Sequence, residues 1–122
     1  MNALRSVAIA LIVIVAAAAA QLPDAFAHHG WSGYAEKAEQ LTGTIRAVRF
    51  GNPHVSIDLE AGKDVWAVIL APPSRMERRG LPDGTLKVGD RVNVEGYRHL
   101  EKQRELRAEW ITVGDKQRVP LR

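Results

Sequence analysis

The stretch His54-Val55-Ser56-Ile57-Asp58-Leu59-Glu60 decides the fold, because its polar and apolar side chains alternate without interruption. Alternation with a period of two is typical of a β-strand that buries one face. Asn52-Pro53 stands immediately before this stretch. An Asn-Pro pair favours a turn, because proline fixes its own φ and keeps the preceding residue out of the helical region. The sequence therefore predicts a half-buried strand introduced by a turn.

Strands are predicted on both sides of this stretch. Leu41–Phe50 is rich in β-branched residues, and Gly43 within it indicates a bulge or a close approach of two backbones. Ala61–Asp64 is a short hairpin connection to Val65–Leu70, which is apolar on both faces and typical of a central strand. Further strands are expected over residues 91–97, where the alternation returns, and over about 105–113.

A short helix is predicted between the third and fourth strands. Ser74 is placed to cap a helix over Arg75–Arg79, and Gly80 stands where a helix C-terminal glycine would. Three strands, a short helix and two more strands is the order of an OB fold. We therefore predict an all-β protein with little helix, a five-stranded OB-like β-barrel. Another small open β-roll or barrel is the alternative.

The chain begins like an export signal. Met1–Arg5 carries one positive side chain, Val7–Ala20 is wholly apolar, and Ala25-Phe26-Ala27 has small residues at both A-x-A positions. The apolar run is shorter than the roughly 20 residues that span a bilayer. We predict an N-terminal signal helix that contacts the membrane only until cleavage after Ala27, and a periplasmic or secreted protein. An uncleaved anchor is the alternative.

The predicted organisation is a signal peptide (1–27), an N-terminal arm (28–40), a barrel domain (41–114) and a loose C-terminal tail (115–122). Cleavage would leave 122 − 27 = 95 residues, enough for one small core. The formal net charge of +3 is a mild excess that requires no nucleic acid. The chain has no cysteine, so neither a disulfide nor a thiolate metal site is available to it.

The chain has four histidines, of which His28, His29 and His54 are the candidate metal ligands. Cleavage after Ala27 would make His28 the first residue, whose α-amine and ring can chelate one metal ion, with His29 beside it. His54 is the favoured third ligand, because the turn before it pre-organises its side chain. Tetragonal nitrogen ligation favours Cu(II) or Ni(II). The alternative is that His54 only caps the Asn-Pro turn through a hydrogen bond. His99 lies among charged residues and is expected to be exposed.

Other side chains are candidates for contact with the arm or with partners. Trp31 and Tyr34, together with Asn52 and Pro53, are predicted to anchor the arm or to wall a pocket. Trp66 and Trp110 lie in predicted strands and are expected in the core. The basic face predicted for the short helix consists of Arg75, Arg78 and Arg79. Nucleic-acid binding is not expected, because the predicted strands lack a series of outward aromatic residues and the predicted signal peptide directs export.

Several motifs taken together resemble those of a known family. They are His28-His29-Gly30-Trp31, Leu41–Ile45, Asn52-Pro53-His54 and Lys87–Gly96. In these motifs the chain resembles a family of small exported bacterial proteins that is known only as a domain of unknown function. The resemblance implies the domain boundaries and includes His28, His29 and His54 in its polar signature. It implies no activity.

No enzyme template fits the sequence. Its serines lie in no nucleophile elbow, and no glycine-rich loop could cradle a phosphate. We predict a non-enzymatic periplasmic protein that binds a divalent metal, with copper favoured, through His28 and His54, with His29 auxiliary. The alternatives are an interaction module for an unknown envelope protein and a binder of a small ligand or oligosaccharide. A redox-active mononuclear copper site is the one enzymatic alternative.

Overall fold

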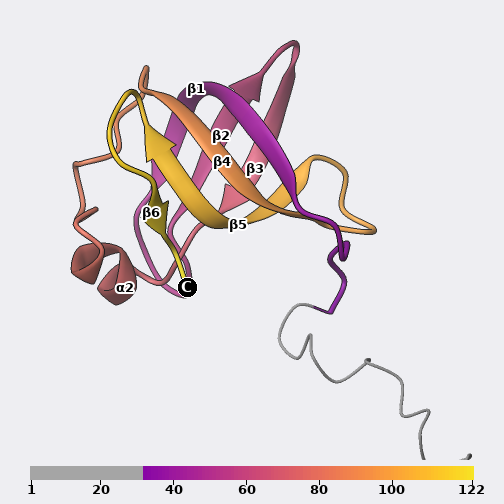
Figure 1. Cartoon of the computed structure of the whole chain (residues 1–122), viewed down its shortest axis with the longest axis horizontal. Helices are drawn as coiled ribbons and strands as arrows, with labels where there is room; N and C mark the ends of the chain where they lie inside the picture. The colour runs from indigo at the N-terminus through magenta and orange to yellow at the C-terminus, as the bar shows by residue number, and fades with distance from the viewer. Residues whose placement is uncertain (1–31) are drawn as a thin grey trace, which may run out of the picture. The chain divides into compact units, whose positions relative to one another are not determined.

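The computed structural model describes residues 32–122 (Figure 1). The strands within this part are β1 (Glu39–Arg49), β2 (Ser56–Ala61), β3 (Asp64–Ile69), β4 (Arg91–Arg98), β5 (Glu105–Val113) and β6 (Val119–Pro120). The helix α2 (Pro73–Arg78) lies between β3 and β4, as predicted. No helix in the described part is long and apolar enough to cross a membrane.

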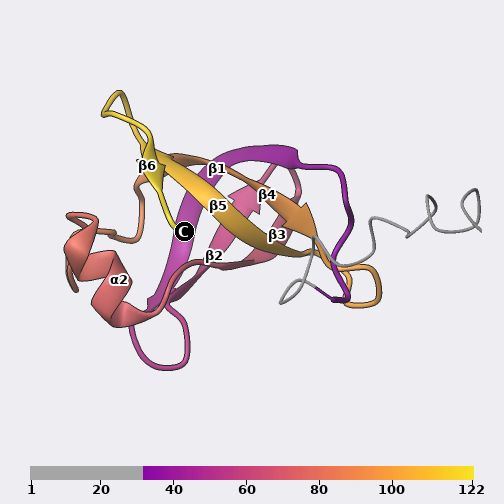
Figure 2. The same ribbon diagram turned by 60° about the horizontal axis from the view of Figure 1, so that its bottom comes forward.

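The first five strands close into a barrel. The sheet order is β3-β2-β1-β4-β5-β6, and β3 also pairs with β5, so the two ends of the five-stranded sheet meet. That closing pair is parallel and short, joining Ala67–Ile69 to Glu105–Arg107, whereas the other pairs are antiparallel. Figures 1 and 2 show the strands wrapped around one axis with α2 at one end. The predicted OB-like barrel is confirmed.

The core follows the alternation that the sequence shows. Val55, Ile57 and Leu59 are buried, and their polar neighbours on β2 are half-buried on the outer face. The most fully buried large side chains are Ile45, Ile57, Leu59, Met76, Leu106, Ile111, Val55, Val68, Val92 and Val94. Trp66 is buried as predicted. Trp110 is only half-buried, and the Arg118 guanidinium covers its ring at 3.9 Å from the centroid, so its assignment to the core is wrong.

Two glycines allow the strands to approach closely. A Cβ on Gly43 would lie 2.1 Å from the carbonyl oxygen of Glu60, and a Cβ on Gly96 would lie 2.0 Å from that of Arg107. No side chain fits at such distances. The close backbone approach predicted at Gly43 is therefore confirmed. A register shift follows two residues later, between Ile45 and Ala47, where β1 bends around the barrel.

The ends of α2 differ in part from the prediction. The helix begins after Pro72 without a side-chain cap, so the predicted capping by Ser74 is wrong. The reason is Pro73, whose fixed φ suits the first helical position and whose missing N–H needs no partner there. Gly80 follows the helix with φ +82°, a left-handed conformation that favours glycine, as predicted.

The C-terminal tail is docked on the barrel, so the prediction of a loose tail is wrong. Val119 and Pro120 pair with β5, and the Leu121 amide donates to the carbonyl oxygen of Glu109 at 2.7 Å. The Leu121 side chain is buried in the core. The prediction was wrong because residues 115–118 are polar, and the single buried leucine that follows them gives no pattern in the sequence.

Candidate functional site

The predicted metal ligands are only partly within the described residues. His28, His29 and Trp31 lie outside them. His54 lies between β1 and β2, and Asn52 and Pro53, joined by a cis peptide bond, are exposed beside it. In residues 32–122 no three His, Cys, Asp or Glu side chains form a group that could hold a metal ion.

His54 lies in a cationic environment. Burial lowers the pKa of its imidazole, and the nearby guanidinium groups of Arg107 and Arg75 lower it further. The ring is therefore neutral at pH 7, which is the form that binds metals. The same two guanidinium groups repel a metal cation, so electrostatics at this position oppose the predicted role.

Tyr34 holds the end of the arm against the barrel. Its hydroxyl donates to Glu105 Oε2 at 2.9 Å, and burial together with this carboxylate raises the pKa of Tyr34 to about 12. Backbone bonds flank it, from the Ala35 amide to the Arg98 carbonyl at 2.8 Å and from the Leu100 amide to the Gly33 carbonyl at 2.7 Å. The arm is thus fixed to the loop that joins β4 to β5, here called the β4–β5 loop (residues 99–104).

His99 is not exposed, contrary to the prediction, because its side chain is only 14% accessible. Its Nδ1 accepts the backbone amides of Glu101 at 3.1 Å and Lys102 at 2.9 Å. These bonds assign the proton of the neutral ring to Nε2, which faces Glu105 Oε2 at 4.0 Å. Neither nitrogen then offers a free lone pair, so His99 organises the β4–β5 loop instead of ligating a metal.

The predicted basic face of α2 has a structural role. Arg75 Nη1 donates to the carbonyl oxygen of Leu121 at 3.4 Å, and Arg79 donates to that of Arg122. These two side chains tie the helix to the C-terminal residues. Arg78 is exposed on the same helix.

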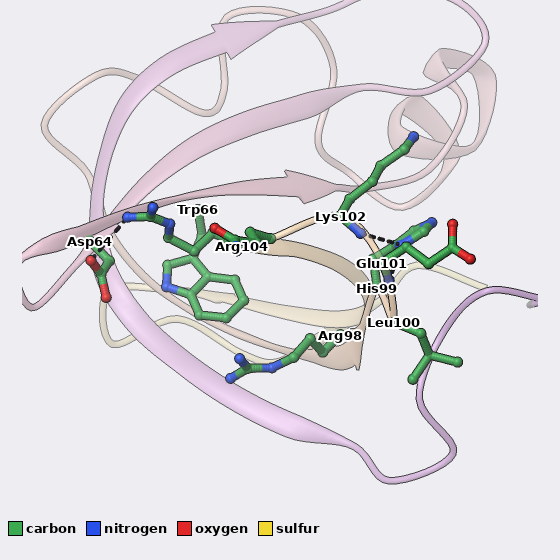
Figure 3. A pocket seen from close by; sticks show the side chains of 9 residues that line it. Asp64, Trp66, Arg98, His99, Leu100, Glu101, Lys102 and Arg104 are labelled. Atoms are coloured by element: carbon green, nitrogen blue, oxygen red, sulfur yellow. Dashed lines mark hydrogen bonds and ion pairs between the residues drawn. The ribbon is translucent and has the colours of Figure 1, made fainter.

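A cleft of about 500 Å³ opens between the start of β3 and the β4–β5 loop (Figure 3). The residues that line it are Asp64, Trp66, Arg98, His99, Leu100, Glu101, Lys102, Gln103 and Arg104. Its volume is within the range of about 300–1,000 Å³ typical of small-molecule sites. None of these residues is among the predicted site residues, because only the closing of the barrel brings them together.

Arg98 is the best-positioned charged group in the cleft. Its guanidinium lies over the Trp66 ring, 4.6 Å from the centroid, and both groups are seen together in Figure 3. Its Nε and Nη2 each donate to one carboxylate oxygen of Glu39 at 2.8 Å, which holds the pKa of that carboxyl below its usual range. Stacking and bidentate pairing fix the plane of the guanidinium. At the other side of the cleft, Arg104 Nη1 bonds Asp64 Oδ1 at 3.2 Å.

Comparison with known proteins identifies a family. A family model described as "Family of unknown function (DUF6152)" matches residues 13–107, which is most of the chain and includes β1 to β4. No curated protein matches the sequence. The predicted resemblance to a family of unknown function is confirmed, and it carries no activity.

Proposed function

This chain belongs to DUF6152, a family of unknown function, and we propose that it is an exported, non-enzymatic binding module whose ligand occupies the cleft at the start of β3. The observation that carries the proposal is that the pair of strands that closes the barrel is short. β3 pairs with β5 only over Ala67–Ile69, so Asp64–Trp66 face the β4–β5 loop across open space. OB folds bind ligands with strands 2 and 3 and with this loop.

The residues of the cleft suit binding better than catalysis. None of the nine lining residues is a serine, threonine or cysteine, the side chains that supply most nucleophiles. The one imidazole there, His99, already bonds two backbone amides. Arg98 is already held in one orientation, so it loses little conformational entropy when a ligand binds, which favours affinity.

Amide chemical-shift mapping tests this proposal on protein that begins at His28. The panel would contain neutral and acidic oligosaccharides, amino acids and short peptides. We expect saturable shifts at Asp64–Trp66 and in the β4–β5 loop, which Arg98→Gln weakens and Arg78→Gln leaves unchanged. Shifts confined to α2 and abolished by Arg78→Gln would support the envelope interaction module instead. No saturable shift with any ligand class would refute the proposal.

Copper binding at the mature N-terminus is a second candidate, supported by Ala25-Phe26-Ala27 directly before His28 and His29. Such a site would use the His28 amine and ring. Cu(II) titration by calorimetry would compare protein that begins at His28, a copy with one extra residue, and His54→Ala. The extra residue should weaken binding, whereas the cationic environment of His54 leads us to expect no effect of His54→Ala. Equal, weak binding in all three would refute the copper hypothesis.

A further inference from the structure

β3 has a free backbone edge beside the cleft, at Val65, between two residues that line it. Leu70 donates its amide to the Val55 carbonyl, so the backbone groups of Leu70 point toward the β2 side. Backbone groups alternate along a strand, so those of Val65 and Ala67 point the opposite way. The Ala67 amide accordingly donates to the carbonyl oxygen of Arg104 at 2.8 Å.

Val65 is two residues before Ala67, where the pairing of β3 with β5 begins, so its backbone groups point to the same side as those of Ala67. Its N–H and C=O point toward the side of the β4–β5 loop, and within residues 32–122 no group of that loop hydrogen-bonds them. An edge that offers a donor and an acceptor on one residue matches the backbone of another extended chain. A simple anion offers no donor for the C=O, and sugar hydroxyls can bond either group but lack the regular spacing of an extended backbone.

Apolar side chains border this edge. Val65 is 50% exposed and Leu100 is 69% exposed, and the described residues contain one other exposed large apolar side chain, Val88. Leu100 lines the cleft, and Val65 lies between two residues that line it. An added strand would therefore bring its own side chains against apolar surface on either side of its backbone.

The charges of the cleft favour an acidic ligand. Its lining has three cationic side chains (Arg98, Lys102 and Arg104) and two acidic ones (Asp64 and Glu101). Two of the five N–H donors of Arg98 are used by Glu39, which leaves three. Lys102 is 70% exposed, and its Nζ is 4.0 Å from the nearest carboxylate oxygen, that of Glu105.

We infer that the cleft binds an extended, acidic peptide segment of a partner protein by adding it to the edge of β3. One residue of the segment exchanges two backbone hydrogen bonds with Val65, and a neighbouring aspartate or glutamate bonds the unused donors of Arg98. The Asp64–Arg104 pair, half-exposed on both sides, adjoins the edge and opens at little cost. This inference rests on the proposed function and names its ligand class.

The probe is a displayed library of random heptapeptides, panned against protein that begins at His28. We expect the selected peptides to share aspartate or glutamate and to be rich in β-forming residues. Val65→Pro should weaken binding of a synthesised selected peptide about tenfold or more, because it removes the donor that faces the peptide. Val65→Ala keeps the amide and should change binding less than about threefold. Arg98→Gln should weaken binding of the acidic peptide and not of its amide-substituted copy.

Whether Val65→Pro folds can be checked directly. The Val65 amide faces away from β2, so proline removes no hydrogen bond of the barrel, and thermal unfolding checks that it folds. As a measurement without any variant, the Val65 amide should exchange rapidly with solvent in the free protein and slowly when peptide is bound. The inference is overturned if no peptide is selected, if Val65→Pro binds normally, or if the Val65 amide stays unprotected. Binding of an oligosaccharide but no peptide would overturn it while leaving the proposed function intact.

Discussion

Replacing Gly43 with alanine tests the barrel geometry most directly. The added Cβ would lie 2.1 Å from the Glu60 carbonyl oxygen and 2.7 Å from its carbonyl carbon. Ordinary contacts of a Cβ begin at about 3.4 Å, so β1 and β2 must separate by roughly 1 Å at this point. The obstacle is backbone, which no rotamer change can relieve. β1 also pairs with β4 here, through Gly43 and Val92, so it has no free side toward which to move.

Overpacking costs about 1–3 kcal/mol of unfolding free energy, and a backbone obstacle places Gly43→Ala in the upper part, at about 2–3 kcal/mol. A domain of this size has a total stability of about 5–14 kcal/mol, so the variant still folds. Each kcal/mol shifts the Tm of a domain of 60–100 residues by about 4–8 °C. The expected decrease in Tm is therefore about 8–24 °C.

Urea denaturation and calorimetry measure both quantities. Gly51→Ala is the matched control, because a Cβ there meets nothing within 4 Å and its φ is not positive. That substitution should be neutral or stabilise by up to about 1 kcal/mol, since it restricts the unfolded chain. If Gly43→Ala matched Gly51→Ala to within about 0.5 kcal/mol, the close approach of β1 and β2 would be refuted.

Three further predictions concern titration and the tail. Tyr34 and Tyr97 are the only tyrosines in the chain, and absorbance titration should show Tyr34 ionising near pH 12; in Tyr34→Phe this step should vanish. Because the folded pKa of Tyr34 exceeds the unfolded value near 10, the unfolded state loses its proton first and stability should fall between about pH 10 and 12. A Tyr34→Phe protein with the same decline would contradict this. The His54 pKa, followed by NMR, should lie below 6.5 and rise in Arg75→Ala; its contribution to stability is lost as pH falls below 6.5, because the unfolded histidine protonates first. Leu121→Ala should lower the free energy of unfolding, measured in urea, by about 2–4 kcal/mol, whereas Lys116→Ala, at an exposed residue, should have little effect. Equal stabilities of the two variants would contradict the docking of the tail on the barrel.

The fold could be predicted from the sequence because the features that determine its strands and turns are local. The alternation at His54–Glu60, the punctuation by Pro72 and Pro73, and Gly43 each constrain one strand or turn, and all agree with the barrel. The tail was mispredicted because one buried leucine in a polar segment has no periodic pattern. Trp110 was mispredicted because its strand does not reveal which face of the barrel a residue occupies where β4 and β5 change register.

The candidate site was not predictable in the same way. Its residues come from the start of β3 and from a charged loop that reads as solvent-exposed, and only the parallel pairing of β3 with β5 brings them together. His99 illustrates the difficulty: its burial depends on Tyr34, 65 positions earlier in the chain, and on two backbone amides of its own loop. A pattern of residue types contains no signal for such contacts.

The cleft and His54 lie at opposite ends of β1, so each can be perturbed without the other. Tyr34 precedes β1 and is fixed to the β4–β5 loop, one wall of the cleft, whereas His54 follows β1 and lies near Arg75 of α2. The Leu100 amide bonds the arm and its side chain lines the cleft, so the arm holds one wall of the cleft in place. Loosening the arm with Tyr34→Phe should therefore affect ligand binding in the cleft and leave the environment of His54 unchanged. The cleft and the environment of His54, the predicted third copper ligand, can thus be perturbed one at a time.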